Sequence, residues 1–146
     1  GQRFQIWSGA IQLFQQRPLF GWGESGYRSE MASMADRDVI AEEIATFNHA
    51  HNDWLNVLAK KGLFGAIWLF AVYAIPLAFF MKRLIRSVDR ETCILATAGA
   101  MLVINFVTYG MAHNALGSNN GVMTYAFWLA VITGGLVERQ RERQHA

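Results

Sequence analysis

The chain has 146 residues, of which 53% are hydrophobic and 16% are charged, and its formal net charge is +2. So small a net charge gives no indication of a nucleic-acid-binding protein, and the single cysteine, Cys93, excludes an intrachain disulfide. The chain begins with Gly1 rather than methionine. We therefore expect it to be the C-terminal part of a longer protein.

An amphipathic helix is predicted near the start of the chain. Its apolar face consists of residues at helical spacing: Phe4, Trp7, Ile11 and Phe14, with Ala10 on the same side. Several glutamines supply the polar surface. The helix is expected to end at Arg17, because the residue before Pro18 avoids the helical region. Two locations remain open for it, on a membrane surface or packed against other helices.

A glycine-rich segment follows, with Gly21, Gly23 and Gly26 in the stretch P-L-F-G-W-G-E-S-G. It is not a dinucleotide-binding loop, because no strand pattern precedes it and no βαβ unit follows it. We expect a tight turn that passes close to a neighbouring segment. Further on, residues 36–47 predict a short helix with its apolar side inward.

Another helix is predicted from His49 to Lys61, with Asn48 as its N-cap and Gly62 as its stop. His51 then lies in the first turn, on the apolar face. The backbone N–H groups there favour a neutral imidazole and suit an anion. The alternative is a structural histidine without a chemical role.

A metal site is not expected around these histidines. His49 and His51 are two residues apart, which puts them on different faces of a helix. Helical zinc sites use an i, i+4 pair instead, and the sequence holds none here.

Three runs without a charged residue occupy the second half of the chain, at 63–81, 93–112 and 121–137, with 19, 20 and 17 residues. About 20 apolar residues cross a bilayer as a helix. Buried helices of a soluble protein are the alternative, but three such runs in a short chain favour membrane spans. The predicted fold is all-α: a helical loop region, 1–62, followed by a membrane unit of three transmembrane helices, 63–146.

The distribution of charge predicts the topology. The loop 82–92 has four basic residues against two acidic ones, and the tail 138–146 has three against two. Short basic segments stay in the cytoplasm, so both are predicted there. The region 1–62 then faces the periplasm of a bacterium, and the chain is a multi-pass protein of the inner membrane.

Three motifs, in this order, resemble the O-antigen ligase family of polytopic bacterial membrane glycosyltransferases. They are G-Q-R-F-Q-I-W-S-G-A at 1–10, R-P-L-F-G-W-G at 17–23, and H-N-x9-G-L-F-G at 51–65. Family members have more membrane spans than this chain. The resemblance therefore implies that N-terminal transmembrane helices of the same protein are missing here.

The resemblance also implies a function. The family transfers a glycan from undecaprenyl diphosphate to the lipid A core on the periplasmic face, as an inverting enzyme that needs no metal, ATP or other cofactor. O-antigen polymerases and protein O-oligosaccharyltransferases are related alternatives that use other acceptors. A non-catalytic transporter subunit is an alternative of another class. Against it, the predicted spans contain no charged residue that would relay an ion.

Carried over from the family by position, the catalytic residues are His51 and Arg3. Transfer to a sugar hydroxyl needs a base, and histidine titrates near the working pH. The leaving diphosphate develops negative charge, and a planar guanidinium holds two phosphate oxygens at once.

Four further residues are candidates for substrate binding. Arg17 and Arg28 are second candidates for the diphosphate clamp. Asn52 either orients the imidazole of His51 or caps the helix. His113, in the outer link between the second and third spans, either contacts a sugar or satisfies the polarity of its loop.

Overall fold

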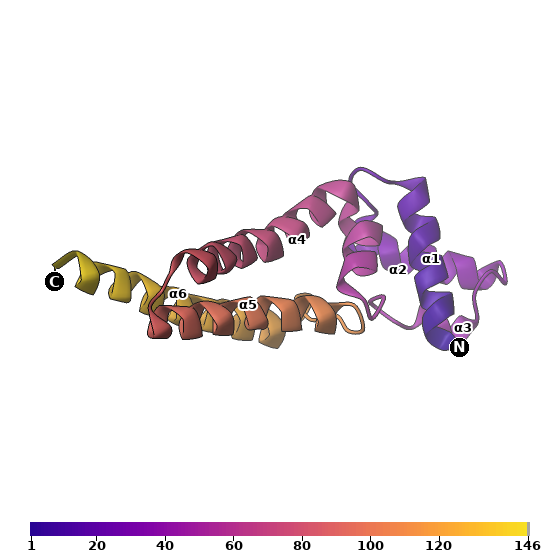
Figure 1. The fold of residues 1–146 in the computed structure, drawn as a ribbon. Coiled ribbons are helices and arrows are strands. Elements are labelled where there is room, and N and C mark those ends of the chain that lie inside the picture. Colours follow the sequence, from indigo (N-terminus) through magenta and orange to yellow (C-terminus); the bar gives the residue numbers. More distant parts are fainter. Residues whose placement is uncertain (146) are drawn as a thin grey trace. The chain divides into compact units, whose positions relative to one another are not determined.

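A computed structural model of the chain describes residues 1–145. Within this range the protein is all-helical, with no β-strand, and Figure 1 labels its helices. Three of them are long and apolar enough to cross a membrane, which confirms the predicted fold class. The chain forms two compact units, one of residues 1–70 with 110–115 and one of residues 71–109 with the segment from Leu116 onward.

The first unit contains α1 (Gln2–Gln16), α2 (Gly23–Asp36), the short α3 (Glu42–Ala45) and the beginning of α4 (Asp53–Arg86). Its core is built from side chains of these helices that are almost fully buried: Ile6, Ala10, Leu13, Tyr27, Met31, Met34, Ile44 and Ala59.

The buried stripe of α1 differs from the predicted one. Ala10 is buried as predicted. However, Phe4 is 72% exposed and Ile11 is 43% exposed, whereas Ile6 and Leu13 are buried. The reason is close approach to α2. A β-carbon at Gly9 would lie 3.0 Å from the sulfur of Met31, so the absence of a side chain at Gly9 allows α2 to approach this face of α1.

The segment between α1 and α4 also departs from the prediction. The short helix expected over 36–47 is wrong in extent, because only Glu42–Ala45 is helical. Instead, a long helix covers Gly23–Asp36. Its buried residues Tyr27, Met31 and Met34 are four and three residues apart, which is the spacing of one helical face.

Helix α4 is interrupted at Gly62, where the backbone takes a left-handed conformation with φ 64° and ψ −159°. The interruption frees two N–H groups of the following turn. Leu63 donates to the carbonyl of Pro18 at 2.8 Å and Phe64 donates to that of Leu19 at 3.3 Å. The turn after α1 is therefore docked on the break in α4.

The second unit contains the rest of α4, together with α5 (Arg90–Gly110) and α6 (Asn119–His145). Close contacts hold these helices together. Tyr125 donates its hydroxyl to the carbonyl of Val72 at 3.0 Å, and a β-carbon at Gly99 would lie 2.5 Å from the ring of Phe80. The predicted runs 63–81 and 121–137 lie inside α4 and α6, whereas α5 ends two residues before the run 93–112 does.

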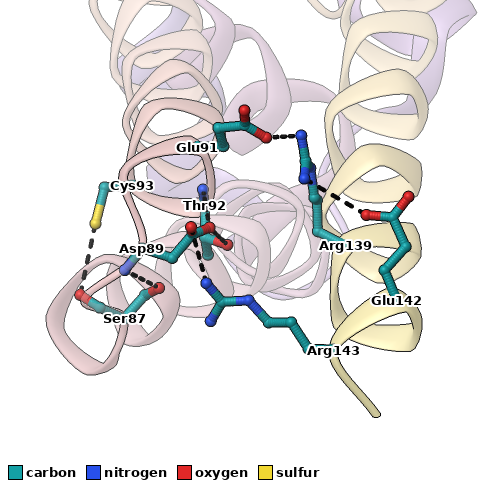
Figure 2. A network of polar contacts seen from close by, with 8 residues as sticks. All are labelled: Ser87, Asp89, Glu91, Thr92, Cys93, Arg139, Glu142 and Arg143. Atoms are coloured by element: carbon teal, nitrogen blue, oxygen red, sulfur yellow. Dashed lines mark hydrogen bonds and ion pairs between the residues drawn. The ribbon is translucent and has the colours of Figure 1, made fainter. Parts of the chain in front are cut away.

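Figure 2 shows a polar network at one end of the second unit. Asp89 caps α5, accepting hydrogen bonds from the backbone N–H of Thr92 at 2.9 Å and from its hydroxyl at 2.7 Å. Arg143 of α6 forms an ion pair with Asp89 at 2.8 Å. The bonds from Thr92, and then Arg143, hold the pKa of the Asp89 carboxyl below its usual value. The network fixes the α4–α5 connection to the end of α6.

Candidate functional site

The segment before α4 carries the histidines and is anchored through Ala50. The indole N–H of Trp7 donates to the carbonyl of Ala50 at 3.0 Å. The N–H of Ala50 lies 3.4 Å from the side-chain oxygen of Asn56. Ala50 itself is fully buried, so α1 and α4 both position the flanking His49 and His51.

Asn52 caps helix α4. Its side-chain oxygen accepts a hydrogen bond from the N–H of Leu55 at 3.0 Å, and its amide nitrogen donates to the carbonyl of Met111 at 2.9 Å. The helix consequently begins at Asp53 rather than at His49, and the prediction of Asn48 as the cap is wrong. Of the two roles predicted for Asn52, the structure supports the cap.

His51 therefore lies just outside the helix, in a left-handed conformation with φ 50°. Residues other than glycine rarely adopt this conformation, and it often marks a functional position. The ring of His51 contacts that of His49, with centroids 4.2 Å apart, and that of Phe47, with centroids 5.5 Å apart. The imidazole is partly buried and oriented by its neighbours.

The surroundings of His51 favour its neutral form. Burial lowers the pKa of the imidazole, and the nearby His49, Arg3 and His113 lower it further. These groups come from three separate segments of the first unit: the start of α1, the loop before α4 and the link after α5. Positive charge on any of these three groups disfavours the imidazolium form of His51, and the same charge would attract an anion to the cluster.

His49 has a buried ring nitrogen that no described residue satisfies with a hydrogen bond. Its Nδ1 atom is buried and has no hydrogen-bond partner among the described residues. Such an atom costs free energy unless a ligand or water satisfies it. Within residues 1–145, no group of three or more His, Cys, Asp or Glu side chains is arranged to hold a metal ion.

Glycines of the second and third motifs bring the turn after α1 close to the backbone of α4. A β-carbon at Gly21 would lie 2.4 Å from the carbonyl carbon of Lys60, and one at Gly62 would lie 2.4 Å from that of Leu19. The N–H of Trp22 donates to the carbonyl of Ala59 at 3.0 Å. The expected tight turn is therefore present, and the neighbour it approaches is α4.

Residues 1–70, which hold the three motifs and all of the cluster except His113, match the family model described as O-antigen ligase. Residues 1–70 therefore form an O-antigen ligase domain of that family. It is also similar to an uncharacterized protein of Haemophilus influenzae, with 27% identity over 125 residues, which is 86% of this chain. The match covers 31% of that protein, so the chain spans about a third of the relative's length.

Two of the predicted substrate-binding residues, Arg17 and Arg28, have other partners. The guanidinium of Arg17 lies over the ring of Trp22, 3.9 Å from its centroid. Arg28 is exposed and forms an ion pair with Glu24 at 3.7 Å. Neither arginine is among the groups that shift the pKa of His51. The structure thus brings together Arg3, His51 and His113, but not Arg17 or Arg28.

Sequence reasoning missed a buried polar face on the first turns of α4. Asp53, Asn56 and Lys60 are all at least 92% buried. The amide nitrogen of Asn56 lies 3.4 Å from the side-chain oxygen of Asn114, which ties the link carrying His113 to α4. The spacing of these polar residues could have predicted this face, since they are three and four positions apart and lie on one side of the helix.

Proposed function

We propose that this O-antigen ligase family member transfers a glycan from undecaprenyl diphosphate to the lipid A core, at the periplasmic face of the bacterial inner membrane. The observation that carries the proposal is the convergence of Arg3, His49 and His113 on His51. It provides a neutral imidazole beside positive charge, as the transfer of a sugar from a diphosphate requires.

The chemistry follows from these groups. The imidazole of His51 accepts the proton of the acceptor hydroxyl while the hydroxyl oxygen forms a bond to the anomeric carbon of the donor sugar. On the opposite side of that carbon, the bond to the diphosphate oxygen breaks, so the anomeric configuration is inverted. The bonding electrons leave with the diphosphate. Arg3 is placed to stabilise the charge that develops there, and the step requires no metal.

The periplasmic location rests on charge. All residues of the cluster lie outside the three charge-free runs, in the segments 1–62 and 113–120. In the proposed topology each run crosses the bilayer once, so these segments and the basic segments 82–92 and 138–146 are on different sides of the membrane. Because short basic segments remain in the cytoplasm, the cluster is on the outer face. A lipid carrier holds its diphosphate at that membrane surface, next to His51.

The test uses the purified full-length protein with a glycan linked to undecaprenyl diphosphate. Three acceptors are supplied in separate reactions: lipid A core, a second lipid-linked glycan, and an acceptor protein. Attachment to lipid A core alone supports the proposal. Product with only the second glycan identifies a polymerase, and product with only the protein identifies a protein O-oligosaccharyltransferase.

His51→Ala is expected to lower the rate about 10²- to 10⁴-fold, which is the usual contribution of a general base. The matched control is His145→Ala, an exposed histidine at the end of α6, which is expected to keep the wild-type rate. Arg3→Lys is expected to be nearly as harmful as Arg3→Ala, because lysine lacks the bidentate fork. A fully active His51→Ala variant would remove the assignment of the base, and a fully active Arg3→Lys variant that of the clamp.

A further inference from the structure

A cavity of about 400 Å³ opens in the second unit, far along the sequence from the histidine cluster. Its walls come mainly from the last turns of α4 and the end of α6, with Ser87 and Thr92 adding the connection after α4 and the start of α5. Figure 1 labels these three helices. Phe79 and Leu136 provide its apolar part, and Lys82, Arg83, Arg86 and Arg143 provide its charge. No carboxylate is among the lining residues, so the cavity is suited to an anion.

The charge of this cavity is largely uncompensated. Arg143 forms an ion pair with Asp89 (Figure 2). Arg83 donates to the neutral side-chain oxygen of Gln140 at 2.7 Å. Lys82 and Arg86 are exposed, and within residues 1–145 the structure shows no ion pair for either. Three of the four cations therefore face the cavity without a carboxylate partner.

The cavity lies where two helices change from apolar to basic. The charge-free run of α4 ends at Met81 and is followed by Lys82, and that of α6 ends at Val137. In a bilayer this transition is the level of the lipid headgroups, where anionic lipids attract basic side chains.

One face of α4 has apolar residues followed by basic ones, as a lipid with an acyl chain and an anionic headgroup requires. Ile75, Phe79, Lys82 and Arg86 follow one another at spacings of four, three and four residues, so they lie on one helical face. Ile75 is 69% exposed and precedes the cavity along the helix. An acyl chain along Ile75 would place its headgroup phosphate between Lys82 and Arg86.

We propose that this cavity is a binding site for the phosphate of an anionic phospholipid. In this site Lys82 and Arg86 of α4 contact the phosphate oxygens. Arg83 and Arg143 add positive charge on the other sides of the phosphate. Phe79 and Ile75 contact the acyl chain. The site is independent of the proposed glycan transfer.

The test is a lipid titration of the purified full-length protein in a zwitterionic detergent, followed by native mass spectrometry and by the midpoint of thermal unfolding. The probe is phosphatidylglycerol, with phosphatidylcholine and inorganic phosphate in parallel. Phosphatidylglycerol is expected to bind and to raise the unfolding midpoint, and added salt is expected to weaken both effects.

Each cation close to an anionic headgroup contributes about 1 kcal/mol, so Lys82→Gln or Arg86→Gln should weaken binding about fivefold, and the double variant about 25-fold. The matched control is Arg90→Gln, which removes an exposed cation at the start of α5 that does not line the cavity, and should leave binding unchanged. Lys82→Arg with Arg86→Lys keeps the charge and should keep binding, which separates loss of charge from loss of fold.

Three results would overturn the proposal. Equal weakening by Arg90→Gln would mean that the lipid responds to diffuse charge. Equal binding of phosphatidylcholine would mean that headgroup charge plays no part. Equal stabilisation by inorganic phosphate at the same concentration would assign the cavity to a free phosphate ion instead.

Discussion

Gly62 packs directly against the backbone of Leu19: a β-carbon at Gly62 would lie 2.4 Å from both the carbonyl carbon and the carbonyl oxygen of Leu19. The left-handed backbone at Gly62 turns the N–H groups of Leu63 and Phe64 toward the turn after α1. Two motifs that lie far apart in the sequence therefore pack against each other at the break in α4, which follows the helical turns that begin beside His51.

Gly62→Ala is expected to lower the free energy of unfolding by about 2–5 kcal/mol, since the positive φ costs about 1–2 kcal/mol and the overlap with Leu19 adds about 1–3 kcal/mol. Gly134→Ala is the matched control, because a β-carbon there meets nothing within 4 Å and alanine favours the helix. Thermal unfolding in detergent compares the two variants. Equal stability of Gly62→Ala and the wild type would contradict the role of this contact.

Two adjacent lysines are expected to behave differently. Lys60 is 6% exposed, and its ammonium group donates to the carbonyl of Asn48 at 2.7 Å and to the carboxylate of Glu24 at 2.8 Å. It also lies 4.9 Å from the centroid of the Tyr27 ring. Lys61 is exposed.

Lys60→Met should lower the free energy of unfolding by about 1–3 kcal/mol, because the Asn48 carbonyl loses its donor and Glu24 its partner. Lys61→Met should change it by less than about 0.5 kcal/mol, as for most surface positions. Both values come from denaturant unfolding of the full-length protein. If the two variants lose the same stability, the buried ammonium group does not hold this part of the fold.

His51 should remain neutral, and the enzyme active, in mildly acidic solution. The pKa of His51 is lowered from its ordinary value by burial and by its neighbours. The unfolded chain therefore takes up a proton first as the pH falls, near pH 6.5. The contribution of the neutral imidazole to stability is present above that pH and is lost as the pH falls through the folded-state pKa.

The acidic limb of the pH profile of kcat/KM should accordingly lie below about 6.5. His113→Gln removes one of the groups that lower the pKa of His51, so it should move this limb toward higher pH. His145→Gln, at the far end of α6, should leave it in place. An acidic limb at or above 6.5 in the wild type would contradict the neutral imidazole.

The membrane helices and the family could be predicted from the sequence. Hydrophobicity over about 20 residues is a property of one continuous segment, so the charge-free runs at 63–81 and 121–137 predicted helices that the structure contains. The three motifs at 1–10, 17–23 and 51–65, taken together, likewise indicated the O-antigen ligase family without any knowledge of the fold.

Only the tertiary structure decided where α4 begins and what surrounds His51. The cap at Asn52 depends on the carbonyl of Met111, and the pKa of His51 depends on Arg3 and His113. These partners are brought together from distant positions in the chain. Helical periodicity is encoded within a few turns, whereas a cap, a left-handed residue and a cluster of cations depend on contacts between segments that no local pattern records.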